Sequence, residues 1–531
     1  PIHTFPHPDY THFPMNRPAS TPVSRRLFAA FPLLLAGVGA WLVWRSTAPY
    51  GIGLTTDPVG YLSVARNVVA GQGWVGYYAG FPDSPLLYWP PLYPALLALL
   101  AALGIEPLLG VRLLNTLLFA ATLAVGAAWL QRHLRRGPWV VLGGAAMLLA
   151  PPLLRVAISA YSEALFILLL LLFLWALAAH LAQPRLLTLG ALTLTAALAM
   201  LTRYVGVVLL PVGVVALLWL RRPLRRGLWE SVSFAFLSWL PLGGWWLRNY
   251  RLSGEITGPR GRATESLADN LKATVDIFAG WMVPQSVPNT VAALLLIALL
   301  VGAAVGYRAQ RDRASTRVLL PPLLLLIIFP LFLILSASAV AYNVMIERFY
   351  TPLYIPLLWL LFFALDRIMA VPRQRNIALY ALLALWLLFN AATVGDLVAT
   401  AMRQGVEEYN GARWRDSALI AQLRAAPVAG PVYSNAPYPV YLYTALEPTI
   451  SPRQQVPPIV AGSPAEDLAA FRAVLAADEP LTLIWFDNDF TRGDTSLFDV
   501  ATLAEQLPAQ FSVVQRVSDG VIYEVRAAPP R

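Results

Sequence analysis

The sequence predicts an all-α polytopic membrane domain followed by a small α/β domain. Of its 531 residues 58% are hydrophobic and 13% charged, with a mean hydropathy of +0.60. Soluble domains are about 45–50% apolar and about a quarter charged. Apolar segments of spanning length recur up to residue 396, and beyond it short strand patterns alternate with amphipathic helices. This composition excludes a soluble enzyme, a disordered chain and a collagen-like fibre.

The N-terminal segment is rich in Pro and His, which predicts a disordered cytoplasmic tail over residues 1–24. Met15 is a more natural translation start than Pro1, and a genuine short tail is an equally open interpretation. The first apolar segment, 27–44, lacks a small-residue cleavage site behind it. We therefore expect it to be a membrane anchor and not a cleaved signal.

A transmembrane domain over 25–396 follows from the apolar segments, since a spanning helix needs about 20 such residues. Eleven spans are predicted, at 27–44, 108–130, 138–152, 163–182, 186–201, 204–220, 228–247, 288–306, 318–337, 350–367 and 375–395.

Segment 86–104 is apolar but carries Pro90, Pro91 and Pro94, which leave only about ten continuously apolar residues. We expect an interfacial or re-entrant helix there, because the Arg-rich connections then share one side of the membrane. Positive-inside bias makes that side cytoplasmic. It predicts a cytoplasmic N-terminus and a long first extracytoplasmic loop, 45–107, in a membrane that we expect to be the bacterial inner membrane.

The region 397–531 has the character of a soluble domain of about 130 residues. Its strands are predicted at 432–435, 481–486 and 511–515, and its amphipathic helices at 413–425, 464–477 and 497–507. This topology makes it an extracytoplasmic α/β domain.

The chain has no Cys and only five His, none of them near the polar residues considered next. Thiolate chemistry and Cys-based metal sites are excluded. Any chemistry must use carboxylates, arginines, hydroxyls or amides.

Asp57 stands just outside the first span, ahead of Pro58 and a helical pattern. It suits a helix N-cap, and a catalytic carboxylate is an equally open interpretation. Glu163 opens another span at the same boundary, where a carboxylate should face a cavity or pair with an arginine. Further polar side chains at this boundary are Arg203, Arg248, Asn249, Glu347, Arg348 and Tyr350. Each arginine alone could be a helix-end snorkel.

These motifs resemble the GT-C superfamily of integral-membrane glycosyltransferases, which includes protein mannosyltransferases and the lipid A aminoarabinose transferase. The resemblance extends over about residues 27–370. It rests on Asp57 with Tyr61, Gly71-Gln72-Gly73, Tyr88-Trp89-Pro90-Pro91, Ser162-Glu163, Thr202-Arg203, Trp246-Leu247-Arg248-Asn249 and Glu347-Arg348-Phe349-Tyr350. Mannosyltransferases of the family carry a Glu after the catalytic Asp, where this chain has Pro58.

The resemblance implies a sugar donor linked to polyprenyl phosphate and a catalytic acid at Asp57. One general base suffices, because phosphate leaves as a stable anion and needs little help from an acid. Direct displacement by the acceptor would invert the anomeric centre. Arg348, with Arg203 and Arg248 behind it, would hold the donor phosphate. Further pocket candidates are Tyr61, Asp83, Glu163, Asn249, Glu347 and Tyr350. Asp83 is either a turn residue or a ligand of a divalent cation, the one cofactor considered.

Sugar and acceptor stay open: the enzyme is a hexosyl- or pentosyltransferase, and the acceptor a protein, a lipid or a glycan. Two other functions are a transporter or flippase of a lipid-linked or anionic substrate and a non-catalytic membrane assembly protein. The net charge is +10. Much of the basic excess is Arg in the predicted cytoplasmic connections, so the expected partner is the lipid bilayer and not nucleic acid.

Overall fold

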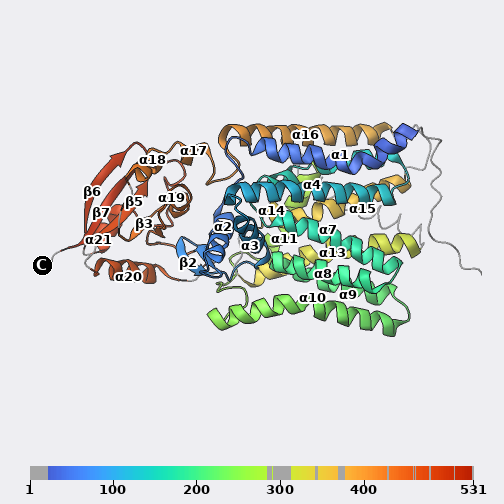
Figure 1. Cartoon of the computed structure of the whole chain (residues 1–531), viewed down its shortest axis with the longest axis horizontal. Coiled ribbons are helices and arrows are strands. Elements are labelled where there is room, and N and C mark those ends of the chain that lie inside the picture. The colour runs from blue at the N-terminus through green and yellow to red at the C-terminus, as the bar shows by residue number, and fades with distance from the viewer. Residues whose placement is uncertain are drawn as a thin grey trace, which may run out of the picture.

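The computed structural model describes residues 22–283, 290, 313–340, 345–368 and 377–528, apart from 427, 429, 459, 461, 478–479 and 508. A helical bundle and a mixed α/β domain are stacked end to end (Figure 1). Parts of the first long loop lie between them, as the positions of α2, α3 and β2 show. The predicted tail lies almost wholly outside the described residues, and the first helix begins at Pro22.

Six helical segments among the described residues are long and apolar enough to cross a membrane. They are α1 (Pro22–Ser46), α4 (Pro107–His133), α7 (Glu163–Ala182), α13 (Arg313–Ala339), the run from α14 (Glu347–Tyr350) through the 3₁₀ turn η2 (Thr351–Leu353) to α15 (Tyr354–Ile368), and α16 (Ile377–Gln404). A seventh span results if α5 (Gly137–Leu148) and α6 (Pro151–Ala157), bent by 51°, cross together. The protein is therefore an integral membrane protein.

Other bundle helices are shorter or more polar. They are α8 (Leu186–Thr202), the 3₁₀ turn η1 (Tyr204–Val208) with α9 (Leu209–Leu220), and α10 (Leu224–Ser253). A helix occupies each predicted span that falls among the described residues, and span 288–306 lies outside them. The count of eleven stays a prediction.

The first loop folds into two helices and a hairpin. These are α2 (Thr56–Val69), β1 (Val75–Tyr78), β2 (Phe81–Pro85) and α3 (Leu92–Ala102). Helix α3, within the segment predicted not to span, has 11 residues. At 1.5 Å per residue it is about 16 Å long, half the thickness of a hydrocarbon core. It packs against α2 and α4.

The terminal domain is built on a five-stranded mixed sheet of order β4-β3-β5-β7-β6. Strand β3 is parallel to β4 and β5, whereas β7 is antiparallel to β5 and β6. Its strands are β3 (Val432–Ser434), β4 (Thr449–Ile450), β5 (Leu481–Phe486), β6 (Ala509–Val517) and β7 (Gly520–Ala527). Its helices are α17 (Ala412–Arg415), α18 (Ala418–Ala425), α19 (Pro437–Tyr443), α20 (Pro464–Leu475) and α21 (Val500–Gln506).

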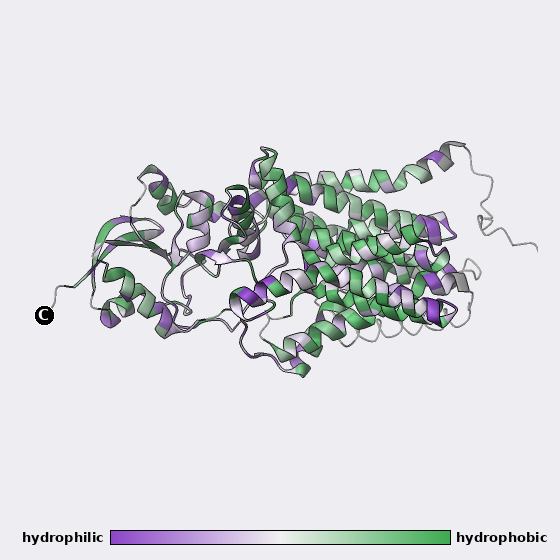
Figure 2. Ribbon diagram, turned by 60° about the horizontal axis from the view of Figure 1, so that its bottom comes forward, coloured by the Kyte–Doolittle hydropathy of each residue, from purple (hydrophilic) through white to green (hydrophobic). Residues whose placement is uncertain are grey.

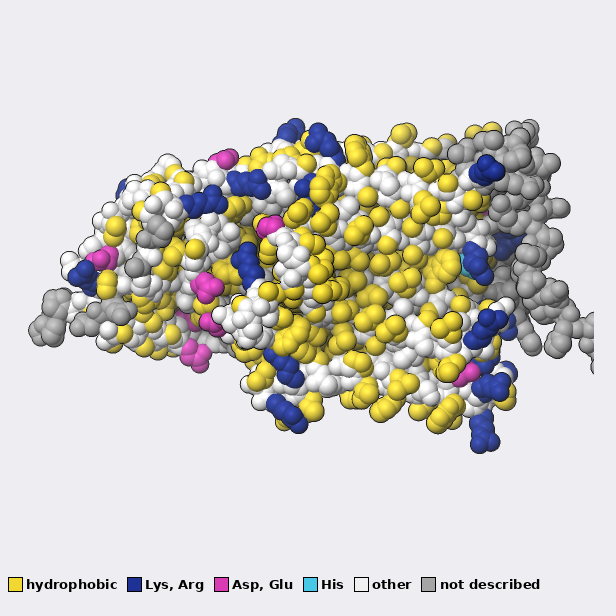
Figure 3. All heavy atoms as spheres, viewed as in Figure 1, with side chains coloured by type: hydrophobic (Ala, Val, Ile, Leu, Met, Phe, Trp, Pro, Cys, Tyr) yellow, Lys and Arg dark blue, Asp and Glu magenta, His cyan; other side chains and the backbone are white. Residues whose placement is uncertain are grey.

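Side-chain chemistry divides the molecule along its long axis. The bundle is hydrophobic along most of its length (Figure 2), and its surface is covered with apolar side chains (Figure 3). Lys and Arg side chains gather at the end of the bundle far from the α/β domain (Figure 3). At the near end, α10 stops at Gly254, whose φ of +76° forms a left-handed cap, and α11 (Leu267–Met282) follows.

Candidate active site

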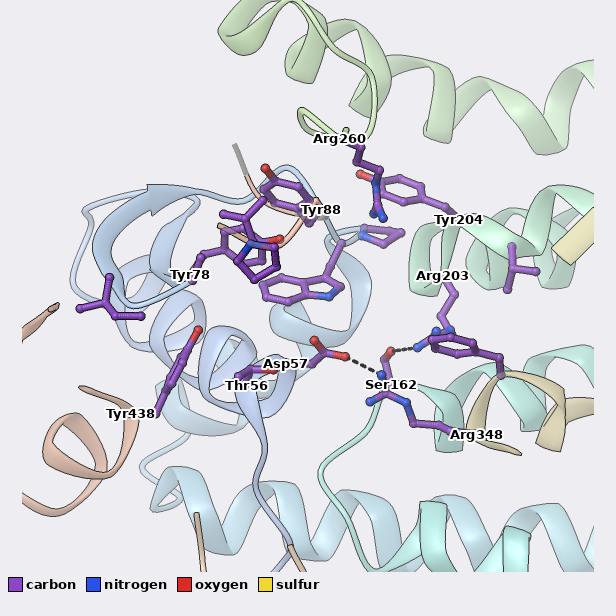
Figure 4. Close-up of a pocket in the computed structure, with 18 of the residues that line it drawn as sticks. Thr56, Asp57, Tyr78, Tyr88, Ser162, Arg203, Tyr204, Arg260, Arg348 and Tyr438 are labelled. Atoms are coloured by element: carbon purple, nitrogen blue, oxygen red, sulfur yellow. Dashed lines mark hydrogen bonds and ion pairs between the residues drawn. The ribbon is translucent and has the colours of Figure 1, made fainter. Parts of the chain in front are cut away.

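A cavity of about 340 Å³ lies where the bundle, the first loop and the terminal domain meet. Asp57, Arg203 and Arg348 all line it. They come from α2, from the turn after α8, and from α14. Figure 4 shows Asp57 in the middle, with the two arginines on one side and Tyr78 and Tyr438 on the other.

Asp57 lies in the first turn of α2, where the helix dipole favours a carboxylate. The cap position belongs to Thr55, so the interpretation of Asp57 as the N-cap is wrong. Its Oδ2 accepts a hydrogen bond of 3.0 Å from Arg348 Nη2. The Asp57 side chain is 21% exposed, which leaves it accessible from the cavity.

Glu163 lies behind this pair, in the first turn of α7, and its side chain is fully buried. Oε1 is 3.2 Å from Arg348 Nε, and Oε2 is 2.7 Å from Arg203 Nη1. Both arginines are thus held by one carboxylate that has no contact with solvent. Glu163 pairs with arginine, as the sequence predicts for a carboxylate at this boundary.

Neighbouring hydroxyl groups complete the cluster. Ser162 Oγ accepts a bond of 3.1 Å from Arg203 Nη1 and lies 3.3 Å from Tyr61 OH. Tyr61 is buried behind the cavity, and burial raises its pKa, so its phenol stays protonated. The Arg348 guanidinium also lies over the ring of Tyr161, 4.2 Å from its centroid.

Arg248 and Asn249 do not line the cavity. Arg248 Nη1 donates to the Leu86 carbonyl at 2.8 Å, and its Nη2 to the Trp74 carbonyl at 3.3 Å. Asn249 is fully buried, and its Nδ2 donates to the carbonyls of Leu87 and Ile256. Both residues hold the first loop against the end of α10.

Glu347, Tyr350 and Asp83 also lie apart from the cavity lining. Glu347 pairs with Arg155 at 2.7 Å and accepts from the Trp281 indole at 3.1 Å. The buried Tyr350 hydroxyl contacts Thr274 at 2.6 Å. Asp83 is exposed on β2 with a φ of +54°. Within the described part of the chain, no three His, Asp or Glu side chains are grouped to hold a metal ion.

The terminal domain forms part of the cavity, which the sequence does not predict. It contributes Tyr438, Ile450, Arg453, Gln455, Pro457, Val460 and Ser496, and the loop after α10 contributes Arg260. Arg453 forms a bidentate pair with Asp467, in which Nε donates at 2.6 Å and Nη2 at 2.9 Å. Arg260 could have been noticed in the sequence, since it follows Arg248 in the same boundary segment.

A two-residue hairpin turn joins the first loop to the terminal domain. Ala79 and Gly80 both have positive φ, between the paired residues Tyr78 and Phe81, as a type I′ turn requires. Gly80 N donates to Tyr438 OH at 3.2 Å, and Gly80 O accepts from Ile450 N at 2.8 Å. The hairpin, whose Tyr78 and Ala79 line the cavity, is therefore bound to the terminal domain there.

No protein-family model and no curated protein matches the chain. Its structure does resemble solved structures. ArnT from Cupriavidus metallidurans in the apo state matches with a TM-score of 0.61 and 15% identity, over 95% of this chain and 100% of that one. The same protein bound to undecaprenyl phosphate matches with a TM-score of 0.58 and 14% identity, over 96% and 100%.

Arabinofuranosyltransferase AftD from Mycobacteria matches with a TM-score of 0.51 and 18% identity, over 95% of this chain and 40% of that one. At these identities the likeness establishes the fold alone. The predicted resemblance to the GT-C superfamily is confirmed at that level.

Proposed function

We propose that this protein is a glycosyltransferase that moves a sugar from polyprenyl phosphate to an acceptor hydroxyl. The observation that carries the proposal is Asp57, which lines a cavity beside two arginines at the end of a membrane bundle. The shared fold with ArnT, one of whose structures contains undecaprenyl phosphate, supports the choice of donor.

Asp57 acts as the general base. Its carboxylate takes the proton of the acceptor hydroxyl while the acceptor oxygen attacks the anomeric carbon. The bond from that carbon to the phosphate oxygen breaks, and polyprenyl phosphate leaves with the bonding electrons. The attack comes from the face opposite the leaving group, so the anomeric configuration inverts. General-base catalysis contributes about 10²- to 10⁴-fold.

Arg348 and Arg203 hold the donor phosphate. A guanidinium stays charged and binds phosphate through two parallel N–H groups. Glu163 fixes both side chains from behind, at 3.2 and 2.7 Å, so their geometry is set before the donor arrives. Arg248 uses its donors on loop carbonyls, and we assign it to support of the loop.

The ion pair between Arg348 and Asp57 suggests an order of binding. Without donor, the guanidinium lies against the carboxylate that must act as base. A phosphate that accepts hydrogen bonds from the Arg348 guanidinium competes with Asp57 for its charge, which weakens this pair and leaves Asp57 free to accept a proton. Donor binding should therefore precede productive binding of the acceptor.

The arginine-rich end of the bundle is the cytoplasmic end by the positive-inside rule. The cavity then opens on the extracytoplasmic face, and the bacterial inner membrane is the proposed location. The donor sugar is a hexose or a pentose.

The test is sugar transfer by the full-length protein in proteoliposomes, with polyprenyl-phosphate sugars and acceptors extracted from cells that lack it. Asp57→Asn should lower transfer at least 100-fold with an unchanged melting temperature. Asp83→Asn, in the same loop but exposed, should keep full activity. Full transfer by Asp57→Asn would overturn the assignment of the base. Wild-type protein that moves the donor across the bilayer without cleaving it would replace the transferase by a transporter.

A further inference from the structure

Two walls of the cavity differ in chemistry. The wall on the bundle side carries the charged cluster of Asp57, Arg203 and Arg348. The facing wall is built by the first loop, the loop after α10 and the terminal domain (Figure 4). It carries Arg260 and also Arg453, which is paired with Asp467. Its aromatic and uncharged polar members are Tyr78, Tyr88, Trp89, Tyr438, Gln455 and Ser496. We call this set the aromatic wall.

Each ring of the aromatic wall is supported by another ring. Tyr78 and Tyr88 stack with centroids 4.0 Å apart and planes 19° apart, and Trp89 meets Tyr78 edge-on at 5.2 Å. Tyr438 stacks on Tyr409 at 5.3 Å and 18°. The rings are therefore fixed before any ligand binds, which lowers the entropic cost of binding.

Polar groups of the terminal domain stand beside the rings. Gln455 N donates to the Ser496 carbonyl at 3.0 Å, which holds the two loops together. Both side chains line the cavity, and Gln455 is exposed. An amide and a hydroxyl supply both donors and acceptors at this wall.

We propose that the aromatic wall binds a carbohydrate acceptor, so that the transferred sugar is added to a glycan. The proposal rests on the proposed transferase function. A sugar ring has an apolar C–H face that packs on an aromatic ring, and a rim of hydroxyls that requires donors and acceptors. The wall offers both. Asp57 lies between this wall and the arginines, where an acceptor hydroxyl would meet the donor (Figure 4).

The same wall is a poor site for an extended peptide. Strand β4 is the sheet edge nearest the cavity, and an extended peptide would bind there by adding a strand. The hairpin already covers it, because Ile450 N donates to Gly80 O at 2.8 Å. A carbohydrate needs no strand edge.

The test follows labelled sugar into three acceptor pools. Membranes from cells that lack the protein are supplied with ¹⁴C-labelled nucleotide sugars, from which their own enzymes form the polyprenyl-phosphate donors. Purified full-length protein is added in detergent. The label gained over membranes without the protein is measured in polysaccharide, in protein and in lipid freed of the donor. Label in polysaccharide supports the proposal. Label confined to lipid or protein overturns the carbohydrate acceptor and leaves the transferase standing. No label in any fraction overturns the transferase itself.

A double variant of the aromatic wall, with a single variant beside it as the control, tests the wall directly. Gln455→Ala with Ser496→Ala should raise the KM for the polysaccharide acceptor about tenfold, since two neutral hydrogen bonds are lost. The kcat and the KM for the donor should stay the same. Gln454→Ala, exposed and outside the cavity lining, is the matched control and should change nothing. An unchanged acceptor KM in the double variant would remove the wall from acceptor binding.

Discussion

Arg348 holds Asp57 through an ion pair of 3.0 Å, although the two residues are 291 positions apart in the chain. The Nε of the same guanidinium lies 3.2 Å from Glu163 Oε1. One planar group thus links the proposed base to a buried carboxylate.

Arg348→Lys should lower kcat/KM for sugar transfer about 10- to 100-fold. A lysine keeps the charge but has one nitrogen, which cannot reach both carboxylates in the directions that the guanidinium uses. A hydrogen bond to a charged group is worth about 1.5–3 kcal/mol. The measurement is steady-state transfer in proteoliposomes. Arg155→Lys, whose partner Glu347 lies outside the cavity lining, is the control and should stay close to wild type. Equal losses in both variants would argue against a special role for Arg348.

Glu163→Gln should destabilise the protein by about 3 kcal/mol, because Arg203 loses its carboxylate partner and Arg348 keeps only Asp57. Unfolding in detergent, followed by intrinsic tryptophan fluorescence, measures the loss. Glu347→Gln removes the carboxylate of a more exposed ion pair, in which the Glu347 side chain is 33% exposed and the Arg155 side chain 51%. That variant should lose about 1 kcal/mol or less. If the two variants were equally stable, Glu163 would not be the anchor of the cluster.

Gly80→Ala should loosen the terminal domain from the first loop. A Cβ at this position would lie 2.5 Å from Ile450 Cβ, and the φ of +83° disfavours any side chain. Gly71→Ala is a matched control, because its φ of +78° imposes the same backbone strain while nothing lies within 4 Å of the new Cβ. Both variants should pay about 1–2 kcal/mol of strain. A larger drop in melting temperature and faster proteolysis are expected for Gly80→Ala alone.

Glu407→Gln should make the protein more stable at neutral pH. Glu407 accepts a bond of 2.9 Å from Ser159 Oγ, and burial raises the pKa of its carboxyl. A raised pKa means that ionisation opposes folding, so wild-type stability falls as the pH rises past the unfolded-state pKa of about 4.3. An amide keeps the acceptor and removes the charge. Melting temperatures should differ at pH 7 and converge below pH 4. Glu505→Gln, at an exposed site, should show no such divergence.

The sequence predicts the bundle end at which each polar residue lies but not the direction of its side chain. Alternation of spans places Asp57, Glu163 and Arg348 at one end, and the structure joins them. Glu347 precedes Arg348 on the same helix and points elsewhere, since each helical residue turns about 100° from the last. Arg248 donates its hydrogen bonds to backbone carbonyls of the first loop, which lie close to it only once that loop has folded.

In the terminal domain the sequence predicts β3, β5 and part of β6, and it misses β4 and β7. Strand β4 has two residues, too few for a periodic pattern. Strand β7 follows a turn of two residues, Ser518 and Asp519, between the paired residues Val517 and Gly520. The Asp519-Gly520 dipeptide at this place is a recognisable hairpin signal. The docking of this domain on the first loop leaves no local pattern at all, because it depends on contacts between distant segments.

The hydrogen bond from the Gly80 amide to Tyr438 joins residues 358 positions apart, and this distance sets when the cavity can first form. A ribosome adding about 5–20 residues per second needs roughly 20 to 70 s to make that stretch. Throughout this time the hairpin lacks the Tyr438 hydroxyl to which the Gly80 amide donates. The cavity is thus completed only late in synthesis, long after the first loop has been made.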